Sequence, residues 1–353
     1  MITSRVNRQW LLARRPEGQV RVEDFVRRDT PLPVPDLAAG EILIQTLMLG
    51  FDPAQRGWMD DSPSYMPPMP LGEPVRASAA ARVVASSNPA YPEGAIVRGL
   101  FSWQDYAVAA REGEAAPVVL PPDVTPEEAL GVLGGASLTA HVGLNQVGRL
   151  RAGDTVLVSG AAGAVGSVAV QIARLKGARV IGIAGGPEKC GWLTEDYGAD
   201  AAIDYRNENV AEQLEALAPE GIDLFFDNVG GQTLEAGIAH IALFGRIVLC
   251  GAISGYNDAD AAPGPRNLMR MTAQRAEMRG FILLDHMDHV LAARAELEGW
   301  LRAGQIRYRT DIQQGFEAIP DTFLRLFNGA SRGKQLLRID EVLLAEAAVR
   351  FGS

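Results

Sequence analysis

Cysteine is scarce in this chain: Cys190 and Cys250 are the only two among 353 residues. Two cysteines are too few for a disulfide framework or for a zinc site with four cysteine ligands. We therefore expect a reducing compartment, the cytoplasm. Basic charge is scarce too, because 33 Lys and Arg stand against 43 Asp and Glu and leave a formal net charge of -10. That balance offers no electrostatic footprint for nucleic acid or for an anionic membrane, so neither is an expected partner.

Long uninterrupted apolar segments are also missing. The apolar cluster near the N-terminus is limited to Trp10, Leu11 and Leu12, which is too short for the core of a signal peptide. The longest weakly polar stretch, 156–173, contains three glycines and is typical of a strand, a turn and a helix, not of a membrane span. We expect a soluble protein with no membrane partner.

A repeated alternation of short strands and helices begins near Asp154. The segment 155–159 (TVLVS) is a continuous apolar run, as expected of a strand covered on both faces, and helical spacing follows from Val165. Further strands are expected at 179–184, 201–204, 222–227 and 246–250, with helices at 186–198, 209–218 and 232–241. The alternation predicts an α/β fold with a doubly wound, Rossmann-type parallel sheet.

About the first 125 residues have a different pattern, in which expected strands are punctuated by Pro and Gly. These strands are at 41–49, 75–85 and 95–109. The pattern predicts an antiparallel, barrel-like, mostly-β domain. Thr125, Pro126 and Glu128 have the spacing of a capping box at a helix start.

Two domains are expected from the chain length. After Gly304 the pattern returns to mixed strand and helix, which suggests that the C-terminal piece packs back on the N-terminal domain. We expect a barrel-like substrate domain at 1–128 and 305–353, a nucleotide domain at 129–304, and a short amphipathic helix at 340–350.

A glycine-rich turn lies between the first strand of the alternating region and its helix. Gly163, Ala164, Val165 and Gly166 belong to the run AAGAVG, which lets the backbone approach a pyrophosphate at a helix N-terminus. The alternative is a tight turn that serves packing alone. Within a strand-helix-strand array we favour dinucleotide binding.

The residues after the second strand decide which dinucleotide is expected. Ala184 is followed by two glycines, where an NAD site usually has an acidic residue. Lys189 lies one turn into the next helix and suits a phosphate dianion, and Tyr205 adds a phenolic donor. NADPH is therefore the expected cofactor. The alternatives are a solvated helix charge for Lys189 and a packing ring for Tyr205.

Metal ligands are not expected. No cysteine precedes residue 190, and the four histidines, His141, His240, His286 and His289, show no ligand spacing. His286 and His289 are more consistent with an exposed helix start. No nucleophile motif supports a hydrolase.

Without zinc, hydride transfer to a carbonyl compound needs another group to hold negative charge on oxygen. A phenol is suitable, and Tyr256 follows the strand at 246–250 on a glycine-flanked loop. Ligands bind beyond the carboxyl ends of such strands. An exposed loop tyrosine is the alternative. The run from Asp227 to Gly231 (DNVGG), which includes Asn228 and lies at the end of the preceding strand, is placed to line the same cleft.

Several motifs in one order resemble the zinc-independent double-bond reductases of the medium-chain dehydrogenase/reductase superfamily, the prostaglandin, alkenal and curcumin reductase group. The motifs are AAGAVGSVAVQIA, GGPEKC, DNVGG, FGRIVLCGAISGYN, FSWQDYAV, FDPAQRGWM and DSPSYMPPMPLGE. The resemblance spans nearly the whole chain. It implies that the mostly-β domain is GroES-like.

The resemblance also implies roles for individual residues. Arg56 and Tyr65 match positions near the substrate cleft. The alternatives are that Arg56 only braces the barrel and that Tyr65 only packs beside its prolines. Ser331 stands where family members often carry Asn, which leaves its cofactor role weak. The remaining implied cofactor contacts are the turn 163–166, Lys189, Tyr205, Asn228, Cys250, Gly251, Ala252, Ile253, Ser254, Phe281, Ile282 and Leu283.

The expected reaction is reduction of the carbon–carbon double bond of an α,β-unsaturated ketone or aldehyde. NADPH gives hydride to the β-carbon, Tyr256 holds the enolate oxygen, and the α-proton comes from Tyr256 or from solvent. The alternatives are an NADPH-dependent quinone reductase and a non-enzymatic nucleotide-binding protein. A homodimer is expected, because the apolar segment 281–284 has the character of an exposed sheet edge.

Overall fold

The computed structural model describes residues 6–32, 37–109, 116–257 and 264–339. The helix expected at 340–350 lies outside the described residues. The chain divides into two compact units: Met1–Leu130 with Thr310–Ser353, and Gly131–Arg309. We call them the first and second unit. Their boundaries lie a few residues further along the chain than those expected from the sequence.

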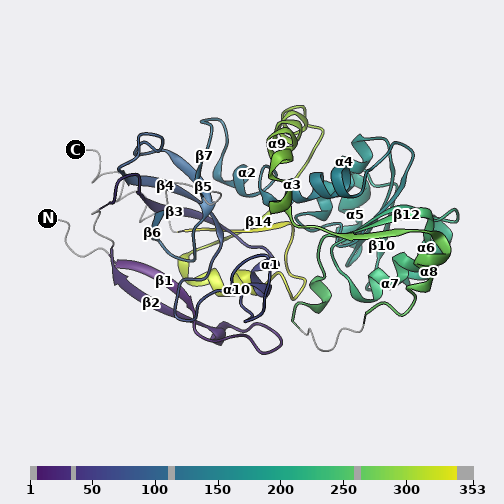
Figure 1. Ribbon diagram of the computed structural model, residues 1–353, viewed down its shortest axis with the longest axis horizontal. Coiled ribbons are helices and arrows are strands. Elements are labelled where there is room, and N and C mark those ends of the chain that lie inside the picture. The colour runs from purple at the N-terminus through teal and green to yellow at the C-terminus, as the bar shows by residue number, and fades with distance from the viewer. Residues whose placement is uncertain (1–5, 33–36, 110–115, 258–263, 340–353) are drawn as a thin grey trace. The chain divides into compact units, whose positions relative to one another are not determined.

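The first unit is mostly β-structure, which confirms the expected fold class (Figure 1). One sheet has the strand order β14-β15-β3-β4-β5-β7, with β6 also on β3, and a second pairs β1 with β2. The strands are β1 Val6–Leu12, β2 Phe25–Pro31, β3 Ile42–Gly50, β4 Ser78–Ser86, β5 Ile96–Leu100, β6 Tyr106–Ala109, β7 Val118–Val119, β14 Thr310–Gln314 and β15 Lys334–Arg338. The helices are α1 Ala54–Gly57, α2 Pro126–Leu130 and α10 Ile319–Leu324, with 3-10 turns η1 Val22–Asp24 and η6 Phe316–Ala318.

Strand β15 pairs antiparallel with β3, so the C-terminal segment returns to the sheet of the N-terminal residues. Helix α2 starts as its sequence predicts: the Thr125 backbone N–H donates to Glu128 Oε2 at 2.8 Å, and the Glu128 N–H donates to Thr125 Oγ1 at 3.2 Å. This reciprocal pair satisfies two N–H groups that have no partner within the helix.

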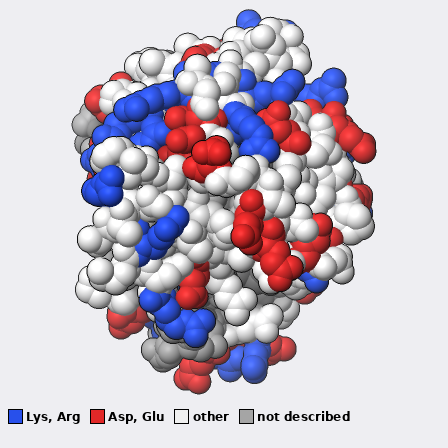
Figure 2. Space-filling model, turned by 90° about the vertical axis from the view of Figure 1, so that its right-hand side faces the viewer, with Lys and Arg blue, Asp and Glu red and all other residues white. Residues whose placement is uncertain are grey.

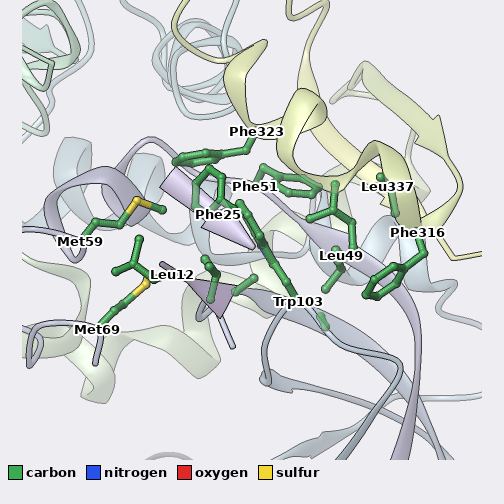
Figure 3. Packing of buried hydrophobic residues seen from close by; sticks show 14 of the residues in the cluster. Leu12, Phe25, Leu49, Phe51, Met59, Met69, Trp103, Phe316, Phe323 and Leu337 are labelled. Carbon is green, nitrogen blue, oxygen red and sulfur yellow. The ribbon is translucent and has the colours of Figure 1, made fainter. Parts of the chain in front are cut away.

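An aromatic cluster forms the core of the first unit (Figure 3). Trp103 is fully buried, and its ring centroid lies 5.0 Å from that of Phe25, 5.8 Å from Phe51 and 5.5 Å from Phe323. Phe323 comes from α10, so the aromatic contacts join the N- and C-terminal parts of this unit. Burial of aromatic side chains on this scale is a large part of what stabilises a domain.

The second unit contains a six-stranded sheet with the order β10-β9-β8-β11-β12-β13, and every pairing in it is parallel. The strands are β8 Thr155–Val158, β9 Arg179–Ala184, β10 Ala201–Asp204, β11 Ile222–Asp227, β12 Ile241–Leu249 and β13 Glu277–Gly280. The helices are α3 Gly135–Val142, α4 Gly166–Leu175, α5 Pro187–Gly191, α6 Val210–Leu217, α7 Gly231–Ala239, α8 Met269–Gln274 and α9 Met287–Arg302. Short π or 3-10 segments are η2 Gly143–Val147, η3 Trp192–Asp196, η4 Ile253–Gly255 and η5 Leu283–His286.

Helices cover both faces of this sheet: α3, α4 and α9 lie on one, and α6, α7 and α8 on the other (Figure 1). The predicted doubly wound parallel sheet is confirmed. Its order reverses between β8 and β11, which are adjacent in space and far apart in sequence. In such sheets the ligand crevice opens at this switch point, outside the carboxyl ends of the strands.

Three expected elements differ from the structure. The exposed edge strand is β13, Glu277–Gly280, and not the apolar segment 281–284. Within that segment Phe281 packs closely, since a Cβ on Gly143 would lie 2.7 Å from Phe281 Cζ, whereas Leu284 is exposed. Strand β12 begins at Ile241 instead of residue 246, and the helix expected at 186–198 is α5 followed by the π-helical segment η3.

No helix in the described ranges combines the length and apolar character needed to cross a bilayer. Acidic and basic side chains lie interspersed on the face of the molecule drawn in Figure 2.

Candidate active site

The turn after β8 brings α4 against the carboxyl edge of the sheet in the second unit. Gly160 has a φ of +57°, and a Cβ on Gly166 would lie 2.3 Å from Gly160 O and 2.7 Å from Ala161 Cα. Residue 166 therefore has to be glycine if the helix is to begin this close to the strand. Gly163, which lies between Gly160 and Gly166 in the sequence, is exposed. The N-terminus of α4, which is the positive end of the helix dipole, thus lies at the edge of the sheet.

A second glycine pair follows β9. Gly186 has a φ of +92°, and a Cβ on Gly185 would lie 2.8 Å from Tyr205 Cε1 and 2.9 Å from Arg206 Nε. The Tyr205 ring and the Arg206 guanidinium therefore rest on the Gly185 backbone. Lys189, half-buried, lies in α5, directly after these glycines. Two polar side chains of the kind that bind phosphate, Tyr205 and Arg206, thus contact this turn, and Lys189 follows it in the chain.

Asp204 holds this turn in place. Its carboxylate accepts hydrogen bonds from the Gly186 N–H at 2.7 Å and from Asn207 Nδ2 at 2.6 Å. The Gly186 hydrogen bond is the main reason that the pKa of Asp204 lies below its usual value. Because the carboxylate accepts hydrogen bonds both from the glycine turn and from Asn207, it fixes the conformation of the loop that carries Tyr205.

The loops after β11 and β12 are joined to each other. Asn228 Nδ2 donates to Ser159 O at 2.7 Å, and the Ile253 and Ser254 N–H groups donate to Asn228 O and Val229 O at 3.3 and 3.1 Å. Ser254 Oγ also donates to Val229 O at 2.6 Å. Through these bonds the predicted cofactor residues, Asn228 and 250–254, form one continuous surface.

Tyr256 ends this surface. The Ala252 N–H donates to its phenolic oxygen at 3.3 Å, and a Cβ on Gly251 would lie 3.0 Å from the same oxygen. Burial raises the pKa of the Tyr256 phenol. The phenol therefore keeps its proton at neutral pH, and no described residue accepts a hydrogen bond from it. Such a group is a donor for an oxygen that develops negative charge.

Burial also raises the pKa of the Cys250 thiol to about 12. A neutral thiol at this position is a small packing group and not a nucleophile.

The other predicted residues are distributed over both units. Phe281, Ile282 and Leu283 are half-buried and follow β13 in the second unit. Ser331, Arg56 and Tyr65 belong to the first unit. Ser331 Oγ donates to Gly333 O at 2.9 Å.

Arg56 is buried in α1, where its guanidinium donates to Asp60 Oδ1 at 2.5 Å and to Gly18 O at 3.2 Å. These are the contacts of a bracing residue, the alternative considered from the sequence. Tyr65 is 46% exposed, and its phenolic oxygen accepts a hydrogen bond from Trp58 Nε1 at 2.9 Å. A role of either residue in substrate binding stays a prediction.

One residue of this edge was not singled out from the sequence. Arg206 follows Tyr205 directly. A positive charge next to a residue already predicted to bind phosphate was the signal that could have identified it. Asp227 was placed at the cofactor cleft with the rest of the motif DNVGG, but only Asn228 was assigned a cofactor contact.

Within the described residues, no group of three or more His, Cys, Asp or Glu side chains is arranged to hold a metal ion. His286 and His289 lie at η5 and the start of α9, with ring centroids 6.2 Å apart.

The chain is similar to known oxidoreductases. Residues 8–117 match the family described as the N-terminal domain of oxidoreductase, and residues 164–296 match the family described as zinc-binding dehydrogenase. The chain is 37% identical over 338 residues to the NADPH-dependent curcumin reductase of Escherichia coli (strain K12), covering 94% of this chain and 97% of the relative.

It is 36% identical over 332 residues to prostaglandin reductase 1 of Rattus norvegicus, covering 93% of this chain and 98% of the relative. Among solved structures, CurA from Vibrio vulnificus in complex with NADPH is similar, with a TM-score of 0.88 and 37% sequence identity. That match covers 94% of this chain and 99% of the solved chain.

Gly166→Ala tests the close approach of α4. We expect this variant to lose about 1–3 kcal/mol of stability, because the added methyl group meets backbone atoms that have no room to move. Gly191→Ala is the control, since its Cβ would come no nearer than 3.9 Å to another group. The measurement is the midpoint of thermal unfolding, and an unchanged midpoint for Gly166→Ala would contradict the geometry.

Proposed function

Because the chain belongs to the double-bond reductase group of the medium-chain dehydrogenase/reductase superfamily, we propose that it reduces the carbon–carbon double bond of α,β-unsaturated ketones and aldehydes. The observation that carries this proposal is the Tyr256 phenol. It is protonated, it accepts an N–H from its own loop, and it lies at the carboxyl edge of β12. We propose that it binds the carbonyl oxygen of the substrate.

NADPH is the cofactor, and the residues at the edge of the sheet fit it. Gly166 lets α4 begin close to the end of β8, and the exposed Gly163 adds no side chain to the turn at the N-terminus of α4, which suits a pyrophosphate. Gly185 and Gly186 follow β9 where an acidic residue would repel a 2′-phosphate. We propose that Lys189 and Tyr205 bind that phosphate and that Arg206 supports them.

The reaction needs few groups from this chain. When bound, NADPH supplies hydride for the β-carbon of the substrate. As the carbonyl oxygen gains negative charge, the Tyr256 O–H stabilises it by a hydrogen bond. The Ala252 N–H, bound to the same phenolic oxygen, orients the phenol. The hydrogen bonds that the Ile253 and Ser254 N–H groups donate to the carbonyls of residues 228 and 229 keep Tyr256 at a fixed place beside the cofactor surface.

The same fold supports a second candidate, NADPH-dependent quinone reduction, because a phenol also stabilises a quinone oxygen. NADPH oxidation measured against enals, aryl enones, long diaryl enones and quinones, with product identification, separates the two. We expect faster turnover of enones, with the saturated ketone as product. Faster turnover of quinones would favour the second candidate, and cofactor binding without turnover of either class would favour a non-enzymatic protein.

We further propose a homodimer in the cytoplasm. In the described part of the chain, β13 pairs on one side only, with β12, and an unpaired strand edge can extend its sheet into a second copy. Both cysteines are free thiols, as suits a reducing compartment.

The oligomeric state is measured by sedimentation equilibrium at micromolar protein. We expect twice the 37.8 kDa of one chain. A mass of one chain throughout the concentration range would contradict the dimer.

Tyr256→Phe removes the proposed donor and keeps the ring. We expect turnover on a good enone to fall on the order of ten- to a thousandfold, with a smaller change in the Michaelis constant for NADPH. Tyr197→Phe is the matched control, because Tyr197 is a buried tyrosine of the same unit whose hydroxyl meets Arg309. Unchanged turnover in Tyr256→Phe would remove the phenol from the mechanism.

Lys189→Ala removes a cation from the proposed phosphate site. We expect the Michaelis constant for NADPH to rise roughly tenfold while weak activity with NADH stays the same, since only NADPH carries the phosphate. Lys176→Ala is the control, because Lys176 forms an ion pair with Glu296 at 3.2 Å. An equal loss with both cofactors would show that Lys189 does not recognise the phosphate.

A further inference from the structure

Asp227 is a fully buried carboxylate at the end of β11, and it accepts hydrogen bonds from three donors. Ser159 Oγ donates to Oδ1 at 2.5 Å, the Val229 N–H donates to Oδ1 at 3.1 Å, and the Gly230 N–H donates to Oδ2 at 3.0 Å. The Ser159 oxygen itself accepts the Asn228 N–H at 2.8 Å, which directs the hydroxyl proton toward Asp227. Burial raises the pKa of Asp227, and the three donors oppose that rise because they stabilise the ionised carboxylate.

The negative charge of Asp227 has no cationic partner. No Lys, Arg or His side chain in the described ranges lies within ion-pair distance of it. Four other buried aspartates are paired with arginine: the nearest N–O distances are 2.7 Å for Asp24, 2.8 Å for Asp105, 2.9 Å for Asp154 and 2.7 Å for Asp311. Asp204, which is also buried, is less enclosed than Asp227 and accepts from Gly186 and Asn207. A buried charge without an opposite charge is costly, and such groups cluster at functional sites.

The position of Asp227 in the fold places this charge at the switch point. Ser159 follows β8 and Asp227 ends β11, so their hydrogen bond joins the two strands between which the sheet order reverses. The Asp227 backbone oxygen accepts the Cys250 N–H at 2.8 Å. Its charge contributes to the raised pKa of both the Cys250 thiol and the Tyr256 phenol. The field of Asp227 therefore extends into the loop that the proposed function assigns to the nicotinamide side of the cofactor.

We propose that the charge of Asp227 stabilises the oxidised, positively charged nicotinamide ring over the neutral reduced ring and so favours hydride release to the substrate. This inference rests on the proposed function. A hydride, one proton with two electrons, leaves C4 of the reduced ring and forms the C–H bond at the β-carbon, while the π electrons of the double bond move toward the carbonyl oxygen. The ring thereby gains one positive charge. Asp227 exchanges no proton and acts through its field.

The direct test compares the dissociation constants of NADP+ and NADPH, measured by calorimetric titration without substrate. In Asp227→Asn we expect the affinity for NADP+ to fall roughly three- to thirtyfold relative to the affinity for NADPH, as Coulomb attraction at an effective dielectric near 20 implies. Equal loss of affinity for both forms, or no change in their ratio, would mean that Asp227 only supports the loops and would overturn the proposal.

Ser159→Ala provides a second test that keeps the carboxyl group.

Other groups near Asp227 have to stay unchanged while Asp227 titrates. The titratable groups that its charge reaches are the Cys250 thiol after β12 and the Tyr256 phenol after η4. The remaining neighbours, the Ser159 hydroxyl after β8 and the Gly230 N–H at the N-cap of α7, do not titrate. Both titratable neighbours stay neutral between pH 5 and 8, because their pKa values are raised. The 2′-phosphate titrates in both cofactor forms and cancels in the ratio.

In the unsubstituted protein, the preference for NADP+ over NADPH falls as the pH is lowered and Asp227 becomes protonated. In Ser159→Ala this fall occurs at higher pH, because a donor to the ionised carboxylate is gone. At pH 8 both proteins show the same ratio. A ratio that does not depend on pH, or the same midpoint in both proteins, would overturn the proposal even if Asp227→Asn does not fold.

These binding measurements separate the inference from the proposed function. If Asp227 controls the ratio but no enone is reduced, the inference stands and the function is wrong. If enones are reduced but the ratio is insensitive to Asp227, the function stands and the inference is wrong.

Discussion

The hydrogen bond between Ser159 and Asp227 joins the two halves of the parallel sheet at the place where its order reverses. The contacts of the loops after β11 and β12 centre on it. The Asn228 N–H binds the same serine, the Val229 and Gly230 N–H groups bind the same aspartate, and the loop of Tyr256 is attached to Asn228 and Val229. One buried carboxylate thus organises the backbone of two loops that come from different strands.

The two edges of this sheet use buried charge differently. At the amino edge, Arg246 binds Asp154 at 2.9 Å and also the carbonyls of Gly148 and Arg149, so its charge is neutralised and its donors are occupied. At the carboxyl edge, Asp227 is neutralised by no cation among the described residues, and Asp204 is occupied by peptide N–H groups. This asymmetry agrees with a division between an edge that stabilises the unit and an edge that binds a cofactor.

The sequence predicted the parts of the fold that depend on local pattern. Continuous apolar runs such as 222–227 identified the buried parallel strands, and Thr125 with Glu128 identified the start of α2. It misplaced the edge strand because an apolar run at 281–284 looks the same whether it pairs at an edge or packs beside Gly143. Asp227 was placed at the cleft with its motif, but its contact with Ser159 was not predicted because the two residues lie 68 positions apart in sequence. A lone aspartate in a turn motif carries no sign that it is buried or that it lacks a cation.

The most direct measurement is a crystal structure of the protein with NADP+ and an unreactive enone analogue. The account predicts the pyrophosphate at the N-terminus of α4, the 2′-phosphate beside Lys189 and Tyr205, and the Tyr256 hydroxyl within hydrogen-bond distance of the ketone oxygen. A 2′-phosphate bound elsewhere, or a phenol turned away from both the nicotinamide ring and the ketone, would contradict it.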